Sequence, residues 1–190
     1  MQPNWFVGVP VTVPDLQTLL QGLPESCRAF NVHDLHMTVA FLGPMHPNCQ
    51  QAVQAVMTEV DSPAFDCSFG KGLALPNEER VSALCLDLAL GRSEAIEMIQ
   101  LWRPRLLRAA QAKPDHRLPL PHVTLARPVR KFGQLARSVG KDWVQRMDVP
   151  AWKIHCDRLV LYTWSENRQE RLFKEVFEHP LPSLTNETKS

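Results

Sequence analysis

The sequence predicts an α+β fold, and two observations support this class. Strand-like segments follow one another directly at 65–75 and 81–90, and again at 154–164 and 171–179. Strands that are neighbours in sequence are typical of hairpins, in which the pairing is antiparallel. Strand–helix–strand units also occur in both halves of the chain. An α+β arrangement with antiparallel pairing is therefore favoured over a doubly wound α/β sheet.

The first quarter of the chain contains two predicted strands and one short helix. The apolar run at 5–11 predicts a buried strand. A helical stretch follows over 15–20 and is stopped by a glycine and a proline. The next strand covers about 34–42 and ends at Gly43 and Pro44.

The middle of the chain contains two predicted helices that flank the first strand pair. Asn48 and Gln51 predict a capping box for a helix over 49–60. An amphipathic helix covers 93–112, and Pro104 must kink or restart it because proline removes a backbone donor.

The last third of the chain returns to strands. A strand begins at about His122, and a weaker helix covers 132–139. The strands at 154–164 and 171–179 follow, and the polar residues at 181–190 predict a solvated tail.

Length and composition limit the class of protein. With 190 residues, the chain can form one domain with a substantial core, or two tightly packed lobes, so we expect one domain over 1–190. The 21 Lys and Arg residues nearly balance 20 Asp and Glu residues, which excludes a broad basic face for long duplexes. Contacts with nucleic acid should therefore be local.

Cysteine usage and hydropathy indicate the compartment. The five cysteines are odd in number and form no CxxC pair, which argues against a disulfide framework and a zinc site. No run of about 18 apolar residues occurs, and the N-terminus lacks a basic, signal-like segment. We expect a soluble, cytoplasmic monomer that does not bind membranes.

A five-residue pattern occurs twice. HMTVA at 36–40 recurs as HVTLA at 122–126, 86 positions further on (122 − 36). Both copies lie in apolar, β-branched segments, where period-two alternation turns the histidine and the threonine to the same face of a strand. Two matched pairs indicate one two-sided site.

The residue types in this pattern suit phosphoryl chemistry. Two histidines facing one cleft can act as general base and general acid, because the ordinary pKa of imidazole lies near neutrality. A threonine two residues further on offers a hydroxyl to an anionic group between the imidazoles. Taken alone, the histidine of either motif could equally be an ordinary strand residue whose hydrogen bonds are satisfied.

Five positions after each motif histidine stand Phe41 and Arg127. They offer a stacking face and a planar cation for a base or a phosphate. Strict alternation turns these positions away from the histidines, so Phe41 is equally well read as a core residue unless the strand bulges there. Arg127 can alternatively form a surface salt bridge.

Other constellations are weaker. His33, Asp34 and His36 do not share one strand face, so we expect no metal site and no cofactor. The sequence contains no HExxH, no GxSxG and no GxxxxGK[ST], which excludes the commonest metalloprotease, serine-hydrolase and nucleoside-triphosphatase motifs.

These segments together resemble a known family. The first strand WFVGVPV, then LHMTVAFLG, PHVTLARP and the late strand LVLYTW are similar, in this order, to the two-histidine (2H) phosphoesterase superfamily. The nearest branch is the bacterial RNA 2',3'-cyclic phosphodiesterases, historically called 2'-5' RNA ligases. The resemblance implies a bilobal α+β fold, with an antiparallel sheet and flanking helices in each lobe. It also implies a pseudo-two-fold axis and an active cleft with one motif per lobe.

The resemblance also implies roles for single residues. It makes two histidines catalytic, two threonines phosphate holders and two further residues flanking ligand contacts: His36 and His122, Thr38 and Thr124, Phe41 and Arg127.

The implied activity is metal-independent opening of 2',3'-cyclic phosphate ends of RNA or nucleotides to 2'-phosphates. His122 would take the proton from water and His36 would protonate the leaving oxygen, or the reverse. Reverse 2'-5' ligation would follow from microscopic reversibility. Two alternatives stay open: a non-catalytic nucleotide-binding module, and a phosphodiesterase for small cyclic phosphates or 2'-5' oligonucleotides.

Overall fold

The structure is a computed structural model that describes residues 2–77 and 79–183. Its helices are α1 (Leu16–Leu19), α2 (Gln50–Thr58), α3 (Arg92–Ala109) and α4 (Gly133–Gln145), with 3-10 turns at Val32–Asp34, Pro47–Cys49 and Arg130–Phe132. Its strands are β1 (Asn4–Pro10), β2 (Cys27–Ala29), β3 (His36–Pro44), β4 (Phe65–Leu75), β5 (Ala83–Leu90), β6 (His122–Pro128), β7 (Ile154–Cys156), β8 (Arg158–Trp164) and β9 (Phe173–Pro180).

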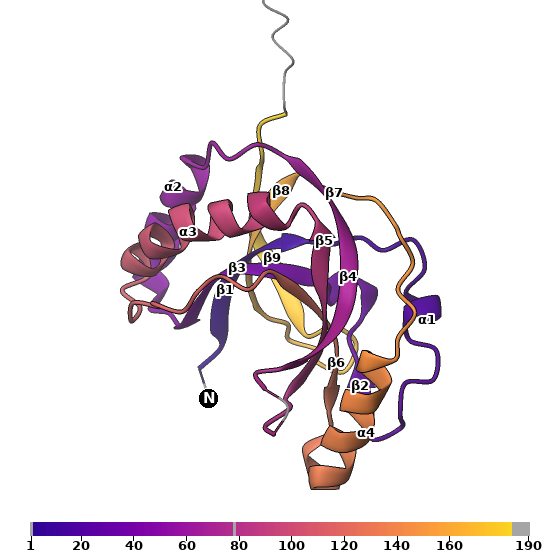
Figure 1. Cartoon of the computed structure of the whole chain (residues 1–190). Helices are drawn as coiled ribbons and strands as arrows, with labels where there is room; N and C mark the ends of the chain where they lie inside the picture. The colour runs from indigo at the N-terminus through magenta and orange to yellow at the C-terminus, as the bar shows by residue number, and fades with distance from the viewer. Residues whose placement is uncertain (1, 78, 184–190) are drawn as a thin grey trace, which may run out of the picture.

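The described strands form one antiparallel sheet in the order β7-β4-β5-β6-β3-β1-β8-β9, with β2 paired to β6 (Figure 1). Counted outward from the junction of β3 and β6, one half runs β3, β1, β8, β9 and the other runs β6, β5, β4, β7. Each motif strand is therefore the innermost strand of its half. The α+β class and the bilobal arrangement are confirmed.

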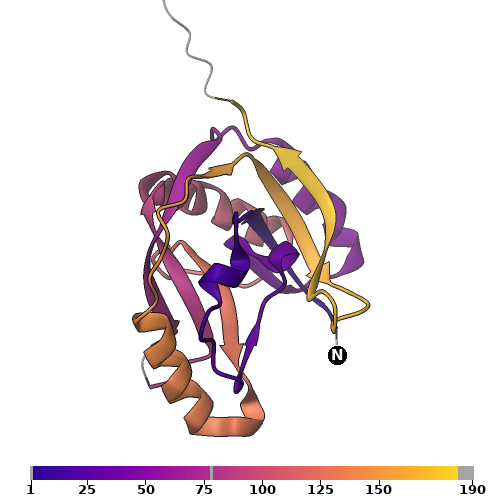
Figure 2. The same cartoon turned by 90° about the vertical axis from the view of Figure 1, so that its right-hand side faces the viewer.

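Helices flank both halves. Helix α3 packs against β3 and against α2, whereas α4 packs against β4, β5 and β6. Figure 2 shows α4 and the α2–α3 pair at opposite ends of the molecule. The main core lies on the face of the sheet that α3 covers, where Trp102 and Leu106 pack with Met37 and Val123. Full burial of such side chains stabilises the fold by roughly 1.5–3 kcal/mol each.

The predicted single strand at 154–164 is wrong, because the segment splits at Asp157 into two strands. Strand β7 pairs with β4 at one end of the sheet, and β8 pairs with β1 and β9 at the other. Only one residue separates these strands in sequence, so the two ends of the sheet must lie close together. The sheet is therefore curled.

Two further local predictions are corrected. Helix α3 continues through Pro104 as one helix, with buried residues on both sides of the proline, so the restart considered at this position does not occur. The capping box is also wrong: the His46 ring accepts the Asn48 N–H at 3.3 Å, and α2 begins without a side-chain cap. Strand β2 was not predicted, since its three residues carry no alternating pattern.

The C-terminal segment is partly described. Residues 184–190 of the predicted tail lie outside the described residues. Leu181 is buried, and its N–H donates to the Asp157 carbonyl oxygen.

All five cysteines are buried, and none of them forms a disulfide. Among the described residues, no helix has the length and apolar character needed to cross a membrane.

Candidate active site

The four polar motif residues meet where β3 and β6 touch. The strands join antiparallel through Met37 and Val123, which are buried and lie between the histidine and the threonine of each motif. In this register each histidine lies across from the threonine of the other motif, on the face opposite the main core. These four partly exposed side chains are His36, Thr38, His122 and Thr124.

Both motif strands carry one extra residue at the same place. Val39 is the extra residue of β3 opposite β1, and Leu125 is the extra residue of β6 opposite β5. A bulge of this kind resets the alternation of faces, so Phe41 and Arg127 return to the face of the histidines. Both side chains are exposed, Phe41 by 54%. The first six residues of both strands share one burial pattern.

His36 is enclosed by aromatic rings. Its ring stacks on Phe6 with centroids 4.5 Å apart, and the Phe173 ring is nearly perpendicular to it, with centroids 5.4 Å apart. Tyr162, stacked on Phe6, is 5.6 Å from the imidazole. Gly8 of β1 lets the backbone of β3 come this close, because a Cβ there would lie 2.8 Å from the Met37 carbonyl oxygen.

The enclosure changes the proton affinity of His36. Burial lowers its pKa to about 4, and the charges of His122 and Arg127 act in the same direction. The hydrogen bond from Nδ1 to the Asp34 carbonyl oxygen, at 2.7 Å, opposes this shift. His36 is therefore neutral in the unliganded protein near pH 7.

Asp34 positions His36 through both its backbone and its side chain. Its backbone carbonyl binds the imidazole, while its buried carboxylate accepts the N–H groups of Leu172 at 2.8 Å and Phe173 at 3.1 Å. The Arg171 guanidinium lies 3.8 Å from the same carboxylate. The turn before β3 is thus tied to the start of β9, which places Phe173 against His36.

His122 lies in a more open setting. Its Nδ1 bonds the Leu120 carbonyl oxygen at 2.7 Å, and burial lowers its pKa. It lines a cavity of about 460 Å³ together with Thr38 and Phe41. Thr38 of the first motif and His122 of the second therefore line one cavity, whereas His36, Thr124 and Arg127 do not line it.

The far wall of this cavity was not predicted from sequence. Asp115 receives a bidentate contact from Arg117, at 2.9 and 2.8 Å, and lies 3.6 Å from Arg103. Leu118 and Leu120, from the same segment, are 88% and 41% exposed. This wall combines compensated charge with exposed apolar surface.

Thr124 contacts a buried cysteine. The Cys85 Sγ lies 3.4 Å from the threonine Oγ1, and the two residues face each other across β5 and β6. Burial raises the pKa of Cys85 to about 11, so its thiol keeps its proton at neutral pH. Cys85 therefore offers the Thr124 hydroxyl a hydrogen-bond partner inside the sheet. Only the strand register, and no sequence motif, identifies it.

Arg127 is an exposed residue, and its Cζ lies 5.6 Å from the centre of the Phe30 ring. Partial burial lowers its pKa, and its charge lowers the pKa of both motif histidines. It therefore lies within electrostatic reach of both imidazoles. The alternative of a salt bridge to Asp or Glu does not occur among the described residues.

The two imidazoles share one hydrogen-bonding arrangement. Since a backbone carbonyl only accepts, each Nδ1 must carry the proton that it donates. In the neutral form each Nε2 is then the proton acceptor. Two basic nitrogens and two hydroxyls thus converge on the face that also carries Arg127.

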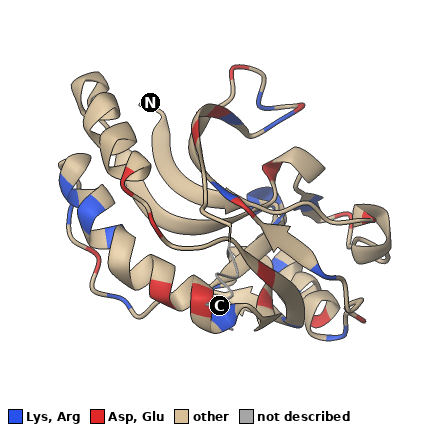
Figure 3. Cartoon of the chain, turned by 90° about the horizontal axis from the view of Figure 1, so that it is seen from above, with Lys and Arg blue, Asp and Glu red and all other residues tan. Residues whose placement is uncertain are grey.

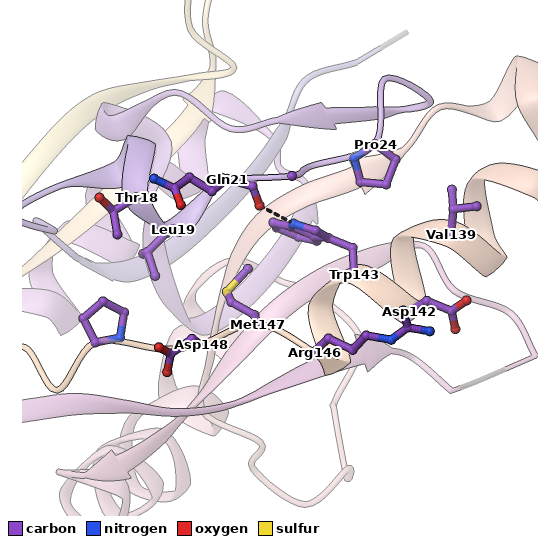
Figure 4. A pocket seen from close by; sticks show the side chains of 12 residues that line it. Thr18, Leu19, Gln21, Pro24, Val139, Asp142, Trp143, Arg146, Met147 and Asp148 are labelled. Atoms are coloured by element: carbon purple, nitrogen blue, oxygen red, sulfur yellow. Dashed lines mark hydrogen bonds between the residues drawn. The ribbon is translucent and has the colours of Figure 1, made fainter.

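Other features of the described chain lie apart from this site. A hollow of about 660 Å³ between α1 and α4 contains none of the motif residues, and there Trp143 donates to the Gln21 carbonyl at 2.9 Å (Figure 4). Within 2–77 and 79–183, no three His, Cys, Asp or Glu side chains group as metal ligands.

No protein-family model and no curated protein sequence matches the chain. Solved structures do match. E. coli LigT complexed with 3'-AMP is similar with a TM-score of 0.72 and 17% identity, over 95% of this chain and 99% of LigT. A phosphoesterase matches with a TM-score of 0.73 and 17% identity, over 96% and 100% of the two chains. TT0787 of Thermus thermophilus matches with a TM-score of 0.66 and 16% identity, over 95% and 99%.

These comparisons agree with the resemblance that the two motifs indicated. At this level of identity the likeness concerns the fold. The chain therefore has the fold of E. coli LigT, of the phosphoesterase and of TT0787.

Proposed function

We propose that this protein is a metal-independent phosphodiesterase that opens 2',3'-cyclic phosphate ends of RNA or nucleotides to 2'-phosphates. The observation that carries this proposal is the pair of imidazoles, each oriented by a carbonyl two residues upstream, with Nε2 as the basic atom. Two opposed proton-transfer groups suit attack on one side of a phosphorus atom and departure on the other. The five unpaired cysteines favour a reducing, cytoplasmic setting.

The reaction can be written with these residues alone. One imidazole takes a proton from water while the water oxygen bonds to phosphorus. The bond between phosphorus and the ribose 3'-oxygen breaks, and the second imidazole gives its proton to that oxygen. Thr38, Thr124 and Arg127 donate hydrogen bonds to the phosphoryl oxygens, where negative charge increases in the transition state.

The surroundings favour His36 as the base and His122 as the acid. Burial lowers the pKa of His36 to about 4, so it is unprotonated and ready to accept a proton. His122, in its more open setting, regains a proton more readily when the phosphate anion binds beside it. Of the two assignments that the sequence left open, this is the one in which His36 takes the proton from water and His122 protonates the leaving oxygen.

The exposed ring of Phe41 lies beside the same cavity and offers a stacking surface for a base. E. coli LigT has been crystallised with 3'-AMP, ATP and NADP+, and these complexes support a nucleotide ligand for the shared fold.

The test is product analysis with a panel of 2',3'-cyclic nucleotides and RNAs with cyclic phosphate ends, with a chelator present. We expect 2'-phosphates as the product. A 3'-phosphate product would overturn the proposed bond cleavage. Binding of the cyclic nucleotide without turnover would favour the alternative of a nucleotide-binding module.

A further inference from the structure

Four arginines gather at the end of the site that Arg127 occupies. Arg28 on β2 lies directly opposite Arg127 on β6, so both side chains leave the same face of the sheet. The Arg28 guanidinium donates to the Arg168 carbonyl oxygen at 2.8 Å. The charges of Arg168 and Arg130 both act on Arg127. We call Arg28, Arg127, Arg130 and Arg168 the arginine patch.

None of the four forms an ion pair with Asp or Glu within the described part of the chain. Neighbouring cations behave differently: Arg171 lies 2.8 Å from Glu175, and Lys174 lies 3.0 Å from Glu166. Arg168 instead lies over the Trp164 ring, 4.4 Å from its centre.

Such a patch is electrostatically unfavourable in the free protein, because neighbouring like charges repel. It also does not reflect a generally basic protein, since the chain has a net charge of +1. Figure 3 shows basic and acidic residues interspersed along the rest of the molecule. A local excess of uncompensated guanidinium groups suits a ligand that brings several negative charges.

We propose that the arginine patch binds the RNA chain that leads to the reacting end, so that successive phosphates pass Arg127 and continue over Arg28, Arg130 and Arg168. This inference rests on the proposed function. A 2',3'-cyclic phosphate ends an RNA strand, so every other phosphate lies on its 5' side and must leave the histidines in one direction. One phosphate can use Arg127, and further phosphates can pair with the other three guanidiniums, of which Arg28 contacts a carbonyl oxygen and Arg168 an aromatic ring.

The opposite side of the site is less suited to a polyanion. There Arg103 and Arg117 share the carboxylate of Asp115, so part of their charge is already compensated. Exposed Leu118 and Phe41 make that side more apolar. The terminal nucleotide faces this cavity, while the rest of the RNA chain leaves over the patch.

The test compares two ligands and two double variants. The ligands are a fluorescein-labelled RNA hexamer that ends in a 2'-phosphate, and the matching 2'-mononucleotide measured by competition. R28Q/R168Q removes two charges of the patch, and glutamine keeps a donor for the backbone contact of Arg28. The control, R105Q/R108Q, removes two exposed charges from α3, which packs on the opposite face of the sheet.

We expect the wild type to bind the hexamer at least tenfold more tightly than the mononucleotide at about 50 mM salt. R28Q/R168Q should weaken hexamer binding by roughly 10- to 100-fold and change mononucleotide binding less than twofold. It should also flatten the plot of log Kd against log salt by about 1.4, since each phosphate contact with a single strand contributes about 0.7. The control should leave the hexamer's salt dependence unchanged.

Equal binding of both ligands by the wild type would overturn the proposal. An equal loss for both ligands in R28Q/R168Q, or the same loss in the control, would do so as well. Turnover of a cyclic mononucleotide by the wild type reports on the proposed function separately. Hexamer binding through the patch without such turnover would overturn the proposed function and leave the RNA-binding surface standing.

Discussion

The two halves of the site share one backbone geometry and differ in their surroundings. In both, the histidine bonds the carbonyl two residues upstream, and a bulge follows the threonine. Around His36 lie Phe6, Tyr162 and Phe173, whereas His122 opens into a cavity. The repeated sequence therefore fixes where the functional atoms lie. Residues outside the repeat set how strongly each imidazole holds a proton.

This difference has a chemical consequence. Two identical imidazoles in identical settings would titrate alike, and neither would be preferred as acid or base. Here burial lowers the pKa of His36 to about 4, and the more open His122 is shifted less. A pair of groups whose surroundings separate their pKa values can divide the two proton transfers.

The largest expected effect comes from removing either imidazole. His36→Ala and His122→Ala should each lower kcat for a 2',3'-cyclic nucleotide by about 10²- to 10⁴-fold, because each removes one proton-transfer group. A near-normal rate in either variant would contradict the paired mechanism.

A second substrate distinguishes the base from the acid. A p-nitrophenyl phosphodiester has a leaving group that needs no proton. His122→Ala should therefore lose much less activity on this ester than on the cyclic nucleotide, whereas His36→Ala should lose activity on both. The opposite pattern would exchange the two roles.

The next effect tests whether the threonines contribute equally. Thr38→Val and Thr124→Val should each weaken binding of a 2'-nucleotide by about 10- to 100-fold, since a hydrogen bond to a charged group contributes roughly 1.5–3 kcal/mol. Valine keeps the shape and branching of threonine, so the strands should remain folded. Calorimetric titration measures both variants. A loss confined to one threonine would show that the phosphate sits in one half only.

Arg127 tests geometry as well as charge. Arg127→Lys keeps the positive charge but loses the planar fork, so it should recover only part of the affinity that Arg127→Ala loses. The same titration with a 2'-nucleotide applies. Unchanged affinity in both variants would remove Arg127 from the phosphate site.

Asp34 belongs to the first half alone. The Leu172 and Phe173 N–H groups bind different oxygens of the Asp34 carboxylate, and Asp34→Asn turns one of these oxygens into an NH2 donor, so Tm should fall and kcat should drop about tenfold. Loss of this contact should admit water around His36 and raise its pKa toward the ordinary value for histidine. The limb of the pH–rate profile that His36 sets should then move to higher pH. The limb set by His122 should not move, and an equal shift of both limbs would contradict a local role.

The motif strands and their polar residues could be predicted because they depend on local pattern. Period-two alternation is read directly from HMTVA and HVTLA, and both segments form strands. Whether Phe41 faced the site could not be decided in this way. Its face depends on the extra residue at Val39, which is defined only by pairing with β1.

The residues missed by sequence share a non-local origin. Asp34 matters because β9 lies beside it, and Cys85 matters because β5 pairs with β6. Arg28 joins the patch only through β2, a three-residue strand without alternation. Each of these roles depends on pairing between segments that are far apart in sequence.

The smallest expected effect is on stability against acid. The pKa of His36 is about 4 in the folded protein and near 6.5 when unfolded, so between these values the unfolded chain binds the proton more strongly. Stability from this source is fully present above pH 6.5 and is lost as the pH falls toward 4. We expect a loss of about 1–3 kcal/mol, below the full value of the shift because His36 keeps some exposure. Urea unfolding between pH 7 and 4 measures it. His36→Asn should remove most of this pH dependence and His122→Asn a smaller part, and equal effects would mean that the two halves enclose their histidines alike.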